Sequence, residues 1–147
     1  MNIFTIGFTQ KSAEQFFETI KLYRIEILLD IRLHNSTQLA GFSKGRDLKY
    51  FLSVICGCAY RHCVDYAPTK KILDDYKKEK ITWPGYEVQY RCLMDERRAV
   101  DDFITCYSGI YESVCLLCAE PTPEHCHRRL FAEMIAERLD DAEIIHL

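Results

Sequence analysis

Hydrophobic positions change their period repeatedly along the chain, which predicts strands alternating with helices. Short apolar runs, typical of strands, cover residues 2–7, 25–32, 59–64, 114–118 and 142–146. Between them, apolar residues recur every three or four positions, which predicts helices over residues 12–23, 47–57, 69–79, 86–93, 95–107 and 122–139. Residues 33–45 lack either period and are expected to form a loop.

This alternation favours an α/β fold, because a helix that follows a strand packs on the sheet and returns the chain parallel to that strand. We predict a three-layer αβα sandwich whose mostly parallel sheet has about five strands in the order 3-2-1-4-5. That order places a topological switch between the first and fourth strands, where ligands of such sheets bind. With 147 residues, 48% of them hydrophobic, the chain suits one core, so we expect a single domain over residues 1–147.

Several helix starts carry capping signals. Ser12 with Gln15 forms a capping-box pattern, and Asp47 and Thr69 each precede a periodic apolar segment. These residues predict where three of the helices begin.

The last helix follows the most buried strand and is expected to carry part of the site. Thr122 is the predicted cap and Pro123 the first helical residue. Stepping back by four from Leu130 and Phe131 directs Cys126 and His127 inward, whereas Arg129 is expected to pair with surface glutamates.

Charge and cysteine content exclude some classes of protein. The net charge of −3 argues against broad binding of nucleic acid backbones, although a local basic cluster could hold one anion. The eight cysteines do not show the spacing of a small secreted framework, and we find no signal peptide or membrane-length apolar run. We therefore expect mostly reduced thiols in a cytoplasmic protein that has no membrane partner.

Candidate site residues gather where strands end, at the predicted switch. Helix N-termini bind phosphate and lower the pKa of nearby thiols, and a guanidinium binds phosphate with a planar fork. We assign catalytic roles to Asp30, Cys118, Cys126 and His127. We assign substrate binding to Gly7, Thr9, Arg32, His62, Glu120 and Arg128. No metal ligand is assigned, and the sequence indicates neither a particular cofactor nor an oligomeric state.

A set of short motifs, distributed over almost the whole chain, resembles the domain of unknown function 488 family. The motifs are Thr5–Gly7, Leu29–Arg32, Leu39–Lys44, Tyr60–His62, Ala67–Thr69 and Leu117–Arg128. The resemblance implies a small bacterial or archaeal cytosolic α/β domain, with shared polar residues at Asp30, Arg32, His62, Cys118, Glu120, Cys126, His127 and Arg128. After Arg32, residues 33–38 replace the basic, proline-rich stretch that is commoner in the family.

Three functions remain open. The first is an enzyme acting on a phosphate-bearing small molecule, a nucleotide or a nucleic-acid end. The second is a metal-binding module with possible ligands among Asp30, Cys118, His125, Cys126 and His127, although Cys126 and His127, as neighbours on a helix, are expected to diverge. The third is a non-catalytic nucleotide or nucleic-acid adaptor, with stacking surfaces from Tyr60, Tyr66, Tyr76, Trp83, Tyr86 and Tyr90.

Overall fold

A computed structural model describes residues 1–36 and 40–147, so part of the expected loop, residues 37–39, lies outside the described residues. The strands are β1 (Asn2–Gly7), β2 (Ile27–Asp30), β3 (Ala59–His62), β4 (Ser113–Cys118) and β5 (Glu143–His146). The α-helices are α1 (Ala13–Leu22), α2 (Gly45–Phe51), α3 (Lys70–Lys77), α4 (Trp83–Glu96), α5 (Ala99–Tyr107) and α6 (His127–Ala136). Short 3₁₀ turns η1 (Gly41–Ser43) and η3 (Val64–Tyr66) and a π-helical segment η2 (Leu52–Cys56) complete the described elements.

The strands form one parallel sheet in the order β3-β2-β4-β1-β5, which confirms the predicted α/β class. The two central strands have exchanged places relative to the predicted order. Both are buried over nearly their whole length, so burial alone does not rank them, whereas β3 and β5 are partly exposed as edge strands should be. β1 and β4 remain neighbours, and Gly7 at the end of β1 pairs with Cys118 at the end of β4.

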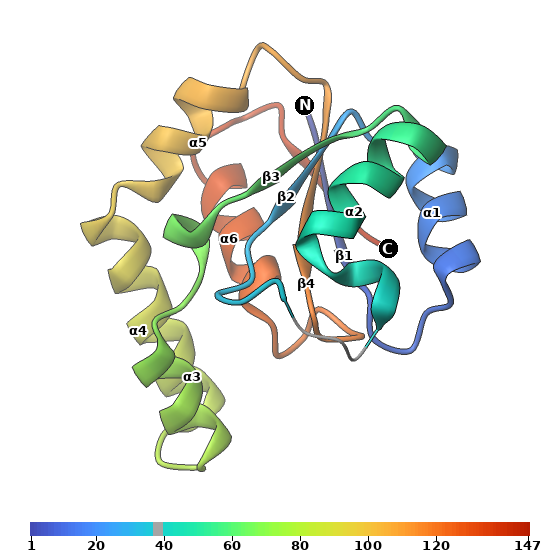
Figure 1. Cartoon of the computed structure of the whole chain (residues 1–147). Coiled ribbons are helices and arrows are strands. Elements are labelled where there is room, and N and C mark those ends of the chain that lie inside the picture. Colours follow the sequence, from blue (N-terminus) through green and yellow to red (C-terminus); the bar gives the residue numbers. More distant parts are fainter. Residues whose placement is uncertain (37–39) are drawn as a thin grey trace.

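Helices cover both faces of the sheet, as Figure 1 shows, with α1 and α2 on one side and α4, α5 and α6 on the other. The side chains of β4 alternate between the two cores: Leu116 belongs to the core under α4–α6, and Cys115 and Leu117 belong to the core under α1 and α2. The connection after β1 runs through α1 and the one after β4 through α6, on opposite faces. The topological switch therefore lies between β1 and β4, as predicted.

Local capping signals explain some helix starts and fail for others. Ser12 and Gln15 form the predicted capping box, and the Thr69 side chain accepts a hydrogen bond from the N–H of Ile72. Asp47 does not cap α2, because that helix already begins at Gly45 and Asp47 lies in its first turn. The α3 helix ends at Lys77, two residues earlier than expected, and α4 begins at Trp83, three residues earlier than expected.

Thr122 is not the cap of the last helix. Residues 121–125 form turns, and α6 begins at His127 with Cys126 as the preceding cap residue in an extended conformation. The buried guanidinium of Arg128 binds the carbonyl oxygen of Glu120 and so holds this connection against the strand end. A tertiary contact therefore outweighs the favourable local signal of Thr122 and Pro123.

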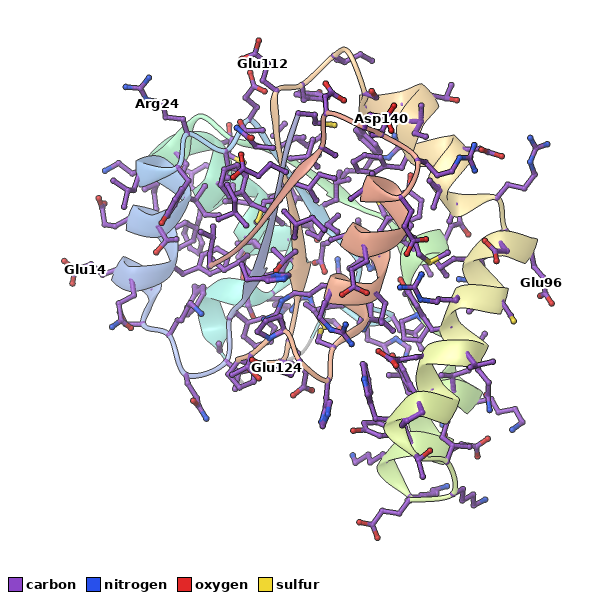
Figure 2. All side chains as sticks on the ribbon, turned by 180° about the vertical axis from the view of Figure 1, so that it is seen from behind. Glu14, Arg24, Glu96, Glu112, Glu124 and Asp140 are labelled. Carbon is purple, nitrogen blue, oxygen red and sulfur yellow. The ribbon has the colours of Figure 1, made fainter. Side chains whose placement is uncertain are left out.

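Charged side chains surround the fold at its periphery. The six labelled in Figure 2, Glu14, Arg24, Glu96, Glu112, Glu124 and Asp140, are all exposed. Among the described residues, no helix is both long and apolar enough to cross a membrane.

Candidate active site

A cavity of 570 Å³ opens at the carboxyl edge of the sheet. Its floor is made by Cys118, Cys126 and His127, which are all buried, and Arg32 reaches it from the end of β2. Tyr76, Trp83 and Tyr86, from α3 and α4, form an aromatic wall on one side. The described lining residues include one guanidinium, on Arg32, and one carboxylate, on Glu120, together with the imidazoles of His34, His125 and His127.

His127 is fixed by two contacts at the floor of the cavity. Its Nε2 lies 2.9 Å from the carbonyl oxygen of Ile31, and its Nδ1 lies 3.7 Å from the Sγ of Cys118. Because a carbonyl oxygen only accepts, Nε2 must donate, and Nδ1 is left facing the sulfur. Burial of His127 confirms the inward direction expected from helical spacing, and the carbonyl oxygen of Ile31 orients the ring.

Cys126 meets the same two residues because it is not helical. As the cap residue of α6 it has φ −135° and ψ 136°, so its side chain does not follow the helical direction that His127 takes. The ligand atoms of Cys118, Cys126 and His127 all lie within 4.8 Å of one another. The expectation that Cys126 and His127 diverge is therefore wrong, since it assumed that both residues belong to the helix.

Electrostatic effects separate the pKa values of the two thiols. A hydrogen bond from Cys126 is the largest influence and, together with the positive charge on His127, holds the pKa of the Cys118 thiol well below its usual range despite burial. Burial and that same hydrogen bond hold the pKa of Cys126 well above its usual range. For His127, burial alone would lower the pKa, but the interactions with Cys118 and Ile31 together raise it.

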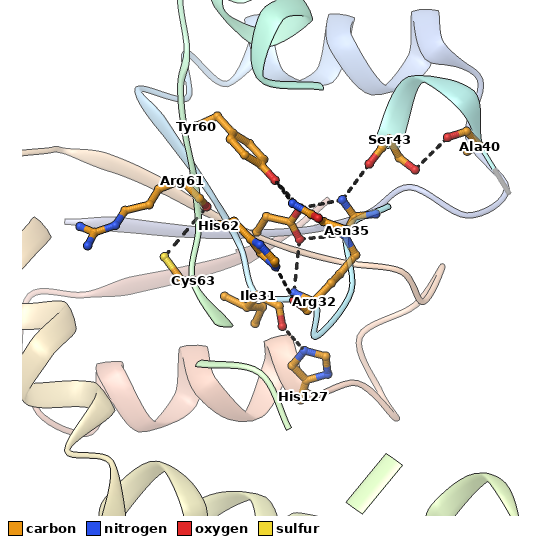
Figure 3. A network of polar contacts seen from close by, with 11 residues as sticks. Ile31, Arg32, Asn35, Ala40, Ser43, Tyr60, Arg61, His62, Cys63 and His127 are labelled. Carbon is orange, nitrogen blue, oxygen red and sulfur yellow. Dashed lines mark hydrogen bonds and ion pairs between the residues drawn. The ribbon is translucent and has the colours of Figure 1, made fainter. Parts of the chain in front are cut away.

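Asp30 and Arg32 form a buried ion pair at the end of β2. The Nε and Nη2 of Arg32 donate to the two carboxylate oxygens of Asp30 at 2.7 and 2.6 Å, and Nη2 also donates to the carbonyl oxygen of Ser43. Tyr60 donates to Asp30 and receives a hydrogen bond from Asn35, as Figure 3 shows. The Nη1 of Arg32 is buried and has no hydrogen-bond partner among the described residues.

Arg128 is fully buried. Its Nη1 donates to the carbonyl oxygen of Glu120 at 2.6 Å and contacts the Sγ of Cys126 at 3.4 Å. Its Nε and Nη2 have no partner among the described residues, and no carboxylate there balances its charge. The guanidinium therefore places positive charge beside the cysteine pair, under the floor of the cavity.

Three of the expected substrate-binding residues, Gly7, Thr9 and His62, lie outside the cavity lining, and a fourth, Glu120, belongs to it. Gly7 lies under the carbonyl of Glu120, and Thr9 donates to the carbonyl oxygen of Ala119 from its backbone N–H at 3.2 Å. His62 bonds the carbonyl oxygen of Arg32 at 2.8 Å and lies outside the cavity lining. Of these four, only Glu120 lines the cavity, while Gly7, Thr9 and His62 hold the chain segments that do.

The aromatic residues divide between core and cavity. Tyr66 and Tyr90 are buried in the core. Trp83 stacks on Tyr86 with ring centroids 4.9 Å apart, and its ring also packs against His125.

Arg129 pairs with Glu133 as expected. Its second partner is Glu87 on α4, and this ion pair links α4 to α6.

Sequence reasoning missed the groups that hold the reactive side chains. The carbonyl oxygens of Ile31 and Ser43 bind His127 and Arg32, and a backbone carbonyl carries no residue-type signal. Tyr60, which donates to Asp30, is thirty residues away along the chain, and Asn35, which donates to Tyr60, lies in the expected loop after β2. Only the polar residues at the strand ends were visible as a pattern.

The comparison with family models decides the classification. The family described as Domain of unknown function DUF488 matches residues 12–135. The chain belongs to this family. No curated protein and no solved structure matches the chain. Membership of the DUF488 family thus covers most of the chain, including every residue of the cavity floor, and assigns no activity to it.

Proposed function

We propose that this DUF488 chain is an enzyme that acts on a phosphate ester whose other part is flat and apolar, such as a nucleotide or an aryl phosphate. The observation that carries the proposal is the convergence of Cys118, Cys126 and His127 on the buried floor of an open cavity. Reactive groups at the base of a concave, largely apolar site are the usual arrangement of a catalytic centre.

The side chains that line the cavity indicate the substrate class. Trp83 and its stacked neighbour Tyr86 offer an aromatic surface for a ring. Arg32, which lines the cavity and whose Nη1 has no partner among the described residues, offers a charged donor for a phosphate oxygen. A molecule with a ring at one end and a phosphate at the other would place its ester bond between these two features, over the floor.

Binding can be tested without a substituted protein, because Trp83 is the only tryptophan of the chain. Its fluorescence reports directly on the aromatic wall. We expect phenyl phosphate to change that fluorescence in a saturable way, at a lower concentration than either phenol or inorganic phosphate. Equal effects from phenol and phenyl phosphate would show that the phosphate is not recognised.

Turnover is tested with p-nitrophenyl phosphate, by following release of nitrophenolate. We expect Cys118→Ser and His127→Asn to reduce the rate by at least about 100-fold, in the range of lost general acid–base catalysis. The matched control is Cys92→Ser, which changes an exposed cysteine outside the cavity and should leave the rate unchanged. Saturable binding with no turnover of any phosphate ester would instead support the adaptor function.

A further inference from the structure

We infer that Cys118, Cys126 and His127 bind a zinc ion whose fourth coordination position opens into the cavity. This inference rests on the proposed function, because it names the group that would act on the phosphate ester. It also changes the role of the two cysteines, from reacting groups to ligands.

The positions of the ligand atoms fit one tetrahedral ion. Zinc binds sulfur at about 2.3 Å and imidazole nitrogen at about 2.0–2.1 Å, so a sulfur and a nitrogen on the same ion lie about 3.6 Å apart. The Sγ of Cys118 and the Nδ1 of His127 are 3.7 Å apart. All three ligand atoms lie within 4.8 Å of one another, which requires only small side-chain rotations to meet one ion.

The orientation of His127 is that of a metal ligand. Ligating histidines usually donate their other ring N–H to a carbonyl or carboxylate, which fixes the ring and directs the lone pair at the metal. The Nε2 of His127 makes this bond with the carbonyl oxygen of Ile31, which leaves Nδ1, on the side of Cys118, as the nitrogen that would coordinate a metal once it is deprotonated.

The charge around the cluster also fits a bound cation with two thiolates. The Nη1 of Arg128 contacts the Sγ of Cys126 at 3.4 Å, and no carboxylate balances this buried guanidinium among the described residues. The N–H of Arg128 beside the Cys126 sulfur is an outer-shell contact of the kind that metal ligands usually receive.

The ligand set selects zinc over hard cations. Two thiolates and one imidazole suit zinc, whereas magnesium and calcium prefer oxygen ligands. Three protein ligands with an open fourth position are the pattern of catalytic zinc sites, and structural sites are closed by four. All three residues line the cavity, so the open position would face the phosphate group of a bound ester. There the ion would polarise a phosphoryl oxygen.

The inference is tested on the full-length protein, purified without chelator from cells grown with added zinc. Elemental analysis should find about one zinc ion per chain, as for an ordinary zinc site. Replacement by cobalt should give the visible absorption of a tetrahedral ion together with a thiolate-to-cobalt charge-transfer band. Cys118→Ser and His127→Asn should each lose most of the zinc, and Cys92→Ser should keep it, with circular dichroism confirming that each variant is folded.

The absorption spectrum of the cobalt-substituted wild type tests the zinc site even if a variant fails to fold. Zinc far below one ion per chain, together with a cobalt-treated wild type that shows no charge-transfer band, would overturn the inference. The proposed function has a separate readout, since the zinc-free protein could still bind phenyl phosphate at Trp83 and turn over an ester. Conversely, a zinc-loaded protein that neither binds nor turns over phosphate esters would overturn the proposed function and leave the zinc site standing.

Discussion

A Cβ atom built on Gly7 would lie 1.8 Å from the carbonyl oxygen of Glu120, far inside van der Waals contact. The two residues are more than a hundred positions apart, and the backbones touch because β1 and β4 are paired up to Gly7 and Cys118. The same carbonyl accepts the hydrogen bond of Arg128. The absence of a side chain at position 7 therefore allows the segment after β4 to pack directly against β1. This packing places the residues that form the cavity floor.

Gly7→Ala should displace this segment and destabilise the protein by about 1–3 kcal/mol, the usual range for forcing extra volume into a packed site. Urea unfolding monitored by circular dichroism measures the change, and zinc content measures the displacement of the ligands. Gly41→Ala is the matched control, because a Cβ there meets nothing within 4 Å. Equal effects of the two substitutions would mean that the Gly7 contact imposes no constraint.

Asp30→Asn should cost about 3–5 kcal/mol of unfolding free energy, because it leaves the buried charge of Arg32 without its partner. The side chains of Asp30 and Arg32 are 0% and 5% exposed, so solvent cannot take the place of the carboxylate. The control is Glu18→Gln, which breaks an exposed pair with Lys21 and should cost less than about 1 kcal/mol. A loss as small as that of the control would show that water or an anion already shields Arg32.

Removing the metal should lower the melting temperature of the wild type by several degrees, since a ligand that binds only the folded state stabilises it. Calorimetry with and without a strong chelator measures this difference. His127→Asn lacks the imidazole ligand, so the same chelator should hardly change its melting temperature. A chelator effect of equal size in both proteins would place the stabilising metal elsewhere.

Buried tyrosines should make the fold sensitive to alkali. Burial is the main cause that raises the pKa of Tyr60, Tyr66 and Tyr107, with hydrogen bonds or charges from Asp30, Asp102 and Cys63 adding to it. A raised pKa in the folded state stabilises the protein below the unfolded pKa, about 10, and this contribution is lost as the pH rises above it.

Absorbance of the phenolate form, recorded as the pH is raised, should therefore show a group of tyrosines that ionise only in a cooperative step coinciding with loss of circular dichroism. Tyr107→Phe should reduce the amplitude of that step, whereas Tyr50→Phe, at an exposed position, should not. Ionisation of all tyrosines in one gradual phase before unfolding would contradict the role of burial.

Much of the fold was predictable because periodicity reports burial locally. The five strands and the sides of the helices that face the core follow from the spacing of apolar residues. The exchange of β1 and β4 in the strand order was not predictable. Both strands are almost fully buried, and the sequence of a buried strand does not indicate which strands pair with it.

The sequence by itself determined which polar residues end the strands and that His127 turns inward. Tertiary structure alone decided that α6 starts at His127, because the contact of Arg128 with Glu120 outweighs the capping preference of Thr122. That shift by a few residues frees Cys126 from the helix and lets its sulfur approach Cys118. A helix cap contributes about 1 kcal/mol of stability. Leaving the buried guanidinium of Arg128 without a hydrogen-bond acceptor would cost more than that, so the contact with Glu120 determines where the helix begins.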